Sequence, residues 1–287
     1  MLYWASRNLG LWESATVFAL VLGLSPVAAA AEAASRTGDE DVVPPSAQAV
    51  LEKAFANMYD CDTRAKIELV MRSRSGAERR RLFQSARKDI EGRQHSIGRL
   101  VEPPDLRGMT VLTIDSEDHG QDAFVYFPSQ RRVRRITTAQ RADAFMGSDV
   151  TYEDLERPRA DAYRVEFLAS ETFQGEAVQV ILAVPNDRRN YTHVHFLVAR
   201  SDSALLATRY FKRGAERPFR SLRAERDSMH TDAGHVLPTE ITVENLARGT
   251  STRVRYYDLQ VNPEIEDRIF SSRFLDRGVD PLARSFD

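Results

Sequence analysis

Residues 63–72 read TRAKIELVMR, and this stretch sets the pattern for most of the chain. Ala65, Ile67, Leu69 and Met71 occupy every second position, with polar or charged residues between most of them. A period of two is typical of a β-strand that buries one face and exposes the other. Residues 63–72 are therefore predicted to form a strand.

The same alternation recurs along the sequence in short segments separated by turn residues. Pairs such as Ser75-Gly76 and Arg248-Gly249 leave so few residues between segments that hairpins are expected. Strands are predicted at 79–88, 94–101, 109–114, 123–127, 131–136, 163–167, 177–184, 193–198, 205–211, 220–225, 239–243 and 252–259. Strands joined in this way form an antiparallel meander, not a parallel sheet with helical crossovers.

One helix is predicted before the strands, at residues 47–59. Val50, Leu51, Phe55 and Met58 fall at helical spacing, and Ser46 precedes them as a capping residue. Such a stripe packs a helix against a core, or it closes the mouth of an apolar cavity. A long meander with one leading helix predicts a mainly β (α+β) fold, in which a strongly curved sheet or incomplete antiparallel barrel wraps around that helix.

Composition excludes several classes of protein. The chain has 287 residues, of which 42% are hydrophobic and 29% charged. Its 40 basic and 42 acidic residues leave a net charge of −2, so charge creates no global attraction to nucleic acid or to an anionic membrane. Cys61 is the only cysteine, which excludes an intrachain disulfide.

The first residues resemble a bacterial secretion signal. Arg7 precedes an apolar run from Ala15 to Leu24, and small residues follow at positions 28–31. That run is shorter than the ~20 residues that a membrane-spanning helix needs. We therefore expect a cleaved signal peptide at residues 1–31, a disordered leader at 32–45 and one domain at 46–287, in the periplasm.

The middle of the chain interrupts the strand pattern. A basic run, Arg131-Arg132-Val133-Arg134-Arg135-Ile136, is followed by a polar spacer and then by FMGSDVTYEDL at residues 145–155. The arginines could bind a lipid phosphate or an acidic partner, pair with the carboxylates of 149–154, or protect an exposed sheet edge. Asp149, Glu153 and Asp154 could hold Ca²⁺, but the spacing matches no calcium loop. Helix capping, by Thr151 and Asp154 or by Ser148 and Asp149, is therefore the prediction.

Nothing in the sequence assembles a catalytic centre. His193 and His195 share a strand face and could begin a zinc site, but the chain places no third ligand beside them. Cys61 has no evident base, and no Gly-x-Ser-x-Gly motif occurs. We predict no catalytic residues, no metal, no cofactor and no enzymatic activity.

Taken in order, these segments resemble the LolA-like proteins, the outer-membrane lipoprotein-sorting family. The segment at 145–155, with Phe145, Met146, Gly147, Ser148, Asp149, Tyr152 and Asp154, carries most of the resemblance, and Tyr126-Phe127-Pro128 before the basic run supports it. This resemblance covers about 60–280 and is greatest to an uncharacterised periplasmic branch that is often associated with RND-type exporters. The chain is longer than the lipoprotein carriers, which leaves its cargo open.

The resemblance implies a half-barrel with a helical lid over an apolar cavity that takes up acyl chains. The residues predicted to line that cavity, or else simply to fill a core, are Ile67, Leu69, Met71, Val111, Leu112, Phe124 and Tyr126. Residues 145–155 would be the lid. The expected function is a monomeric periplasmic carrier of a lipid or of lipoprotein acyl chains, with a membrane exporter or outer-membrane acceptor as partner. The alternatives are a sensor or exporter subunit with the same fold, and, third, a metal-dependent hydrolase.

Overall fold

The computed structural model describes residues 44–116 and 121–276. The chain divides into the units Met1–Pro44 and Pro45–Asp287, and every element below belongs to the second unit. The predicted signal peptide at 1–31 and nearly all of the predicted leader lie outside the described residues. None of the described helices is long and apolar enough to cross a membrane.

Antiparallel β-structure dominates the described residues, as the alternating pattern predicted. The strands are β1 (Thr63–Arg72), β2 (Glu78–Ile90), β3 (Arg93–Glu102), β4 (Thr110–Asp115), β5 (Gln121–Phe127), β6 (Arg132–Ile136), β7 (Tyr163–Phe173), β8 (Glu176–Pro185), β9 (His193–Ala199), β10 (Leu205–Phe211), β11 (Arg220–Ala224), β12 (Met229–Asp232), β13 (His235–Pro238), β14 (Glu240–Asn245) and β15 (Thr250–Val261). All predicted strands are present. The β12–β13 hairpin was not predicted, because its two four-residue strands are too short to show a period.

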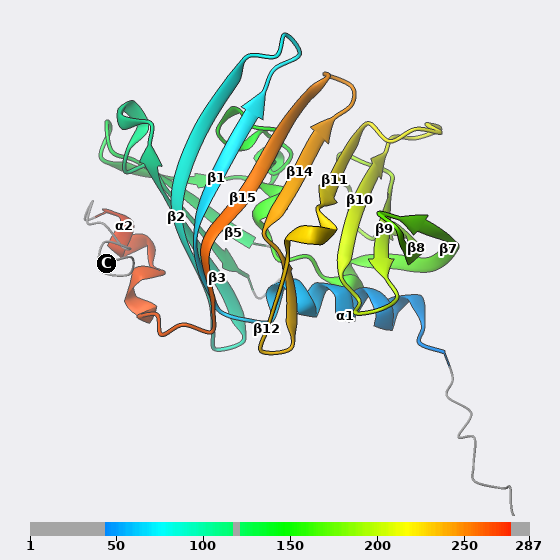
Figure 1. Cartoon of the computed structure of the whole chain (residues 1–287). Coiled ribbons are helices and arrows are strands. Elements are labelled where there is room, and N and C mark those ends of the chain that lie inside the picture. The colour runs from blue at the N-terminus through cyan, green and yellow to red at the C-terminus, as the bar shows by residue number, and fades with distance from the viewer. Residues whose placement is uncertain (1–43, 117–120, 277–287) are drawn as a thin grey trace, which may run out of the picture. The chain divides into compact units, whose positions relative to one another are not determined.

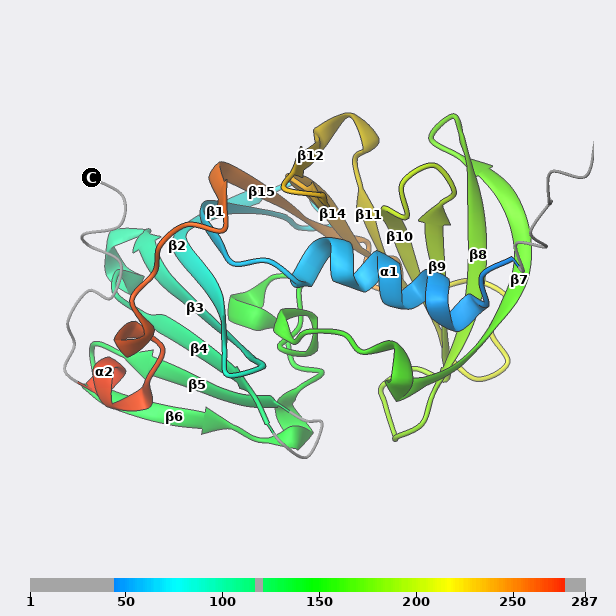
Figure 2. The ribbon, with the colours of Figure 1, turned by 90° about the horizontal axis from the view of Figure 1, so that it is seen from below.

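Thirteen strands form one sheet in the order β6-β5-β4-β3-β2-β1-β15-β14-β11-β10-β9-β8-β7. Strand β15 returns from the end of the chain to pair with β1, which joins the two halves of the meander. The first and last strands of this order, β6 and β7, are not paired with each other, so the sheet remains open. It curves around helix α1 (Ala47–Tyr59), as Figures 1 and 2 show. The predicted incomplete barrel is confirmed.

Helix α1 covers part of the inner face of the sheet. The Ser46 hydroxyl accepts a hydrogen bond from the Ala49 N–H at 3.2 Å, which caps the helix. Leu51, Ala54 and Phe55 are buried against β8 and β9. The rings of Phe55 and Phe196 meet edge to face, with 5.4 Å between their centroids.

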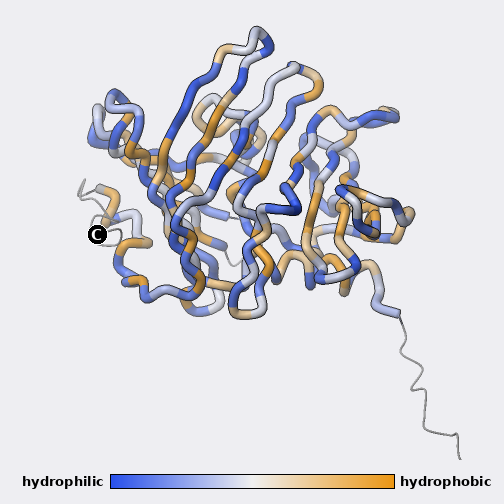
Figure 3. Tube along the Cα trace, in the orientation of Figure 1, coloured by the Kyte–Doolittle hydropathy of each residue, from blue (hydrophilic) through white to orange (hydrophobic). Residues whose placement is uncertain are grey.

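The two faces of the sheet carry different clusters, because successive side chains of a strand point in opposite directions. Figure 3 shows the resulting alternation of hydrophilic and hydrophobic residues along the strands. The inner face holds the α1 cluster and a second cluster formed by β1–β5, β14, β15 and the segment at 145–155. The outer face of β2–β5 is covered by a C-terminal segment that contains the 3₁₀ turn η7 (Asp267–Ile269) and helix α2 (Ser272–Asp276).

Short 3₁₀ turns fill much of the described chain between β3 and β7. These are η1 (Pro104–Leu106), η2 (Thr138–Gln140), η3 (Phe145–Gly147), η4 (Glu153–Leu155) and η5 (Ala160–Ala162), and a further turn, η6 (Arg226–Ser228), precedes β12. The predicted helical insert is thus two single turns, η3 and η4, rather than a helix.

Candidate ligand cavity

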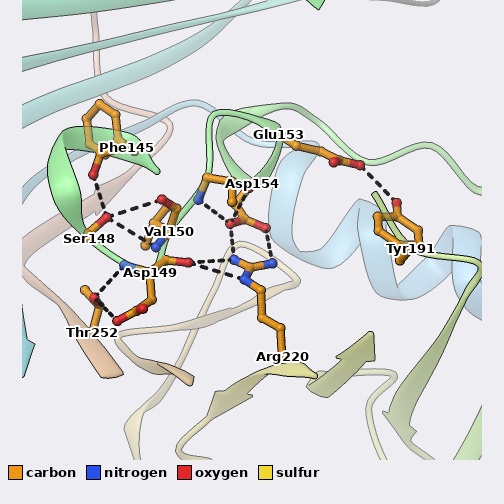
Figure 4. A network of polar contacts seen from close by, with 10 residues as sticks. Phe145, Ser148, Asp149, Val150, Glu153, Asp154, Tyr191, Arg220 and Thr252 are labelled. Carbon is orange, nitrogen blue, oxygen red and sulfur yellow. Dashed lines mark hydrogen bonds and ion pairs between the residues drawn. The ribbon is translucent and has the colours of Figure 1, made fainter. Parts of the chain in front are cut away.

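The segment at 145–155, called the insert from here on, folds on itself through local hydrogen bonds. Met146 and Gly147 both have positive φ, 50° and 74°, which turns the chain sharply after Phe145. The Ser148 hydroxyl donates to the Phe145 carbonyl at 2.6 Å, and the Phe145 N–H donates to the Val150 carbonyl at 2.7 Å. Figure 4 shows this part of the chain.

Asp149 fixes the insert to the N-terminal end of β15. Its carboxylate accepts hydrogen bonds from the hydroxyls of Thr250 at 2.5 Å and Thr252 at 3.0 Å. The Asp149 N–H donates back to the Thr252 hydroxyl at 2.9 Å. Because Thr252 is completely buried, these bonds are shielded from water (Figure 4).

Asp154 fixes the other half of the insert through a buried ion pair with Arg220 of β11. The side chains are only 8% and 9% exposed, and Arg220 also donates to the Asp149 carbonyl at 3.1 Å. Burial lowers the pKa of Arg220, but the adjacent Asp154 carboxylate outweighs it and the pKa is raised. Asp154 also accepts from the N–H of Thr151 at 2.7 Å, but the 3₁₀ turn η4 that follows starts after Tyr152 and has no side-chain capping hydrogen bond.

A third contact joins the insert to the β8–β9 loop. Glu153 accepts from Arg189 at 2.6 Å and from the Tyr191 hydroxyl at 3.0 Å. The Tyr191 and Tyr163 hydroxyls lie 3.0 Å apart, and burial raises the pKa of both. The acidic residues of the insert therefore bind Arg220, Arg189 and hydroxyl groups, and their described partners do not include the basic run of β6.

A cavity of about 1140 Å³ lies within this inner side, bordered by α1, the insert and β1–β4, β10, β11, β14 and β15. Its volume is slightly above the ~300–1,000 Å³ typical of small-molecule sites. Three residues predicted to line it, Ile67, Leu69 and Val111, do so. The lining also contains the apolar or aromatic residues Phe83, Phe145, Val150, Leu222, Ile241, Val243, Val254 and Tyr256.

The other four predicted residues are not part of this lining. Leu112, Phe124 and Tyr126 face the outer side, where they pack against the C-terminal residues Ile269 and Phe270. Val111 and Leu112 are neighbours on one strand, so they cannot both face inward. Met71 is buried but does not border the cavity.

One end of the cavity is polar. Gln94 donates its side-chain amide to the Tyr59 carbonyl at 2.8 Å, and the Asp115 carboxylate accepts from the Gln94 N–H at 3.2 Å. Arg141 and Glu156 form an ion pair at the same border. Burial raises the pKa of both Asp115 and Glu156. The cavity therefore joins an apolar interior to a polar end that carries charges of both signs.

The histidine pair and the basic run have other surroundings. The rings of His193 and His195 lie 5.4 Å apart and pack on Phe211. Within the described residues, no three His, Cys, Asp or Glu side chains form a cluster that could hold a metal. Strand β6 is the edge of the sheet, and its arginines are exposed there, with Arg135 paired to Asp122. This arrangement fits edge protection.

Sequence reasoning missed the residues that hold the insert in place. Arg220, Arg189, Tyr191 and Thr252 lie 36 or more positions away from their partners in the insert. One feature could have identified Arg220. It lies two positions from Leu222 on β11, so its side chain points to the same face of the sheet as Leu222, which lines the cavity. An arginine at an inward position needs a buried partner.

Comparisons with known proteins place the chain among its relatives. A protein-family model described as "Uncharacterized protein" matches residues 92–277. The chain belongs to this family. No curated protein matches the sequence.

Three solved structures share the fold. The first is an outer membrane lipoprotein-sorting protein domain from Vibrio parahaemolyticus, with a TM-score of 0.74, 22% identity and coverage of 80% of this chain and 98% of that one. A DUF1329 family protein from Desulfovibrio piger has a TM-score of 0.69 and 21% identity, covering 75% and 91%. The LolA superfamily protein NE2245 from Nitrosomonas europaea has a TM-score of 0.62 and 23% identity, covering 80% and 99%. The resemblance to LolA-like proteins is confirmed for the fold.

Proposed function

We propose that this protein carries a lipid, or the acyl chains of a lipoprotein, in the cavity between α1, the insert and the inner face of the sheet. The observation that supports this proposal is the cavity of about 1140 Å³, whose inner part is lined by apolar side chains. Each methylene group removed from water contributes ~0.8 kcal/mol to binding. Removing an acyl chain of ~16 carbons from water therefore contributes on the order of 12 kcal/mol, and it requires an enclosed apolar space.

The fold adds support. Structures with the same fold include a lipoprotein-sorting domain and a LolA superfamily protein, and a carrier of that kind would act in the periplasm between membrane-bound partners. An exporter or an outer-membrane acceptor is the expected partner. The predicted signal peptide is consistent with that location, and fractionation of cells followed by N-terminal mass analysis tests it.

Native mass spectrometry of the purified protein is the primary test, with uptake of a fluorescent fatty acid as the second measurement. We expect a co-purifying lipid or acyl peptide and saturable uptake. Protein that is free of lipid and takes up no fatty acid contradicts the proposal.

A matched pair of variants locates the ligand. Ile241 of β14 borders the cavity, whereas its neighbour Thr242 points to the other face. Ile241→Trp should place a bulky ring in the cavity and weaken uptake, while Thr242→Trp should leave uptake intact. Equal uptake by the two folded variants would place the ligand elsewhere.

A further inference from the structure

Three consecutive hairpins of the sheet end side by side. In the sheet order, β2-β1, β15-β14 and β11-β10 are neighbouring pairs, each joined by a short loop or turn. Arg72 is paired with Ser251, and Arg220 with Asn245, so the connections 73–77, 246–249 and 212–219 lie at the same end of the sheet. Figure 1 shows all three at its upper side. Arg74 packs beside Gly249, which links the first two turns directly.

These hairpin tips, defined as residues 72–80, 212–219 and 245–251, are strongly basic. They contain only two acidic residues, Glu78 and Glu216. Their basic residues, all exposed, are Arg72, Arg74, Arg79, Arg80, Lys212, Arg213, Arg217 and Arg248.

Most of these charges have no counter-charge. Arg80 lies 3.7 Å from Glu68, and Lys212 binds the Asn190 side chain. For the other six, no carboxylate of the described residues lies within 4.0 Å. By contrast, Arg253 and Arg255, further along β15, pair with Glu240.

The opposite end of the sheet is acidic. Its turns and loops include 89–93, 225–232 and 262–268, which together carry more acidic than basic residues. The chain is nearly neutral as a whole, yet its fold separates the two signs. Such a separation orients a protein toward an anionic surface with its basic end first.

We propose that the hairpin tips dock on an anionic lipid bilayer. The tips form a row along the sheet end rather than a groove, which suits a broad surface. Leu246, at the β14–β15 turn beside Arg248, is 51% exposed and would enter the interfacial region. An acidic protein partner is the competing occupant, and the polyglutamate comparison below separates it from a bilayer. The docking involves none of the cavity residues, so it is independent of the proposed carrier function.

Vesicle co-sedimentation tests the proposal with the full chain. Phosphatidylcholine vesicles are compared with vesicles in which one third of the lipid is phosphatidylglycerol. We expect clearly stronger binding to the second kind, and weaker binding as salt rises from about 0.1 M to about 1 M, because the screening length falls from ~10 Å to ~3 Å. The apolar run at 15–24 is common to every sample and sets the baseline on phosphatidylcholine.

Two triple variants provide the decisive comparison. Each arginine near an anionic surface contributes roughly fivefold to partitioning, so Arg74→Gln, Arg213→Gln and Arg248→Gln together should weaken binding by on the order of 100-fold. The control replaces three exposed arginines away from the tips, Arg200→Gln, Arg223→Gln and Arg273→Gln, and should bind nearly as the parent does.

Three outcomes overturn the docking proposal. They are equal binding to both vesicles, unchanged binding of the tip variant, and capture by an acidic polypeptide such as polyglutamate without binding to vesicles. The Ile241→Trp variant, which obstructs part of the cavity, should bind vesicles normally, which separates a failure of docking from a failure of the carrier function.

Discussion

Arg220 shows how a single side chain determines the position of a whole segment. It extends from β11 under the insert, where it neutralises Asp154 and donates to the Asp149 carbonyl, with the ring of Tyr210 5.0 Å from its guanidinium carbon. A buried charge without its partner is far more costly than an exposed one, because water cannot solvate it. Loss of either partner of this ion pair should therefore destabilise the insert.

Arg220→Met should lower the free energy of unfolding by about 3–5 kcal/mol, the cost of leaving a buried carboxylate unpaired. Urea denaturation followed by circular dichroism measures this change. Arg253→Met serves as the control, since Arg253 is half-exposed and pairs with Glu240 at 3.3 Å; it should cost less than about 1 kcal/mol. Similar losses in both variants would mean that the Arg220 pair is not effectively buried.

Asp115 should make stability depend on pH. Burial raises the pKa of its carboxyl above the ordinary 3.8, so the ionised form is less favourable in the folded protein than in the unfolded chain. Stability is therefore lost as pH rises from 3.8 through the folded pKa. Asp115→Asn should be more stable than the parent near pH 7, and the difference should disappear near pH 3.

Denaturation across that pH range measures the effect. The amide introduced by Asp115→Asn could donate to the Gln121 side-chain oxygen, which has no partner among the described residues, so the change should be accommodated. Asp258→Asn, at an exposed position, controls for the loss of one negative charge. A lower stability of Asp115→Asn at pH 7 would contradict the burial argument.

At the scale of elements, the insert is held to the sheet at three points. Asp149 joins it to β15, Asp154 joins it to β11, and Glu153 joins it to the β8–β9 loop. Three separate strands or loops thus hold a segment that contains only single 3₁₀ turns. Those contacts determine one border of the cavity.

Thr252→Val should loosen the insert specifically. The substitution keeps the shape of the side chain but leaves the Asp149 N–H and carboxylate each short of one buried partner, at a cost of about 1–3 kcal/mol. Hydrogen exchange at the Phe145 and Ser148 amides should accelerate, since both bonds lie within the insert. Thr242→Val, on the other face of the neighbouring strand, should change stability by less than about 0.5 kcal/mol. Unchanged exchange in Thr252→Val would show that Asp149 does not anchor the insert.

At the scale of the described domain, the two faces of the curved sheet have different surroundings. The inner face borders the cavity, and the outer face of β2–β5 is covered by the C-terminal segment. Stability and ligand uptake should accordingly respond to different mutations.

Phe270→Ala tests this difference between the two faces. Phe270 is 3% exposed and packs on the outer cluster beside the His95 ring, 6.1 Å away. Its truncation should cost about 3–5 kcal/mol of stability. Uptake of fluorescent fatty acid by the folded fraction should be unchanged, the reverse of the Ile241→Trp result. Loss of uptake in folded Phe270→Ala would place the ligand on the outer face.

The sequence by itself determined the local structure of this protein. Alternation predicted every strand of the main sheet, Ser46 and the apolar stripe predicted α1, and the residues at 145–155 identified the fold. These features depend on side chains close together in the chain, so periodicity and capping reveal them. The alternation of side chains along a strand would also have predicted that Val111 and Leu112 face opposite sides of the sheet.

Only the tertiary structure decided which distant groups meet. The Arg220–Asp154 pair, the Thr252–Asp149 bonds and the basic row of hairpin tips each combine segments that are far apart in sequence. Alternation shows that a side chain faces one side or the other, but the pairing of β15 with β1 and the curvature of the sheet decide what lies opposite it. A nearly neutral chain can therefore fold into a domain with one basic end, because antiparallel pairing gathers alternate turns at the same end.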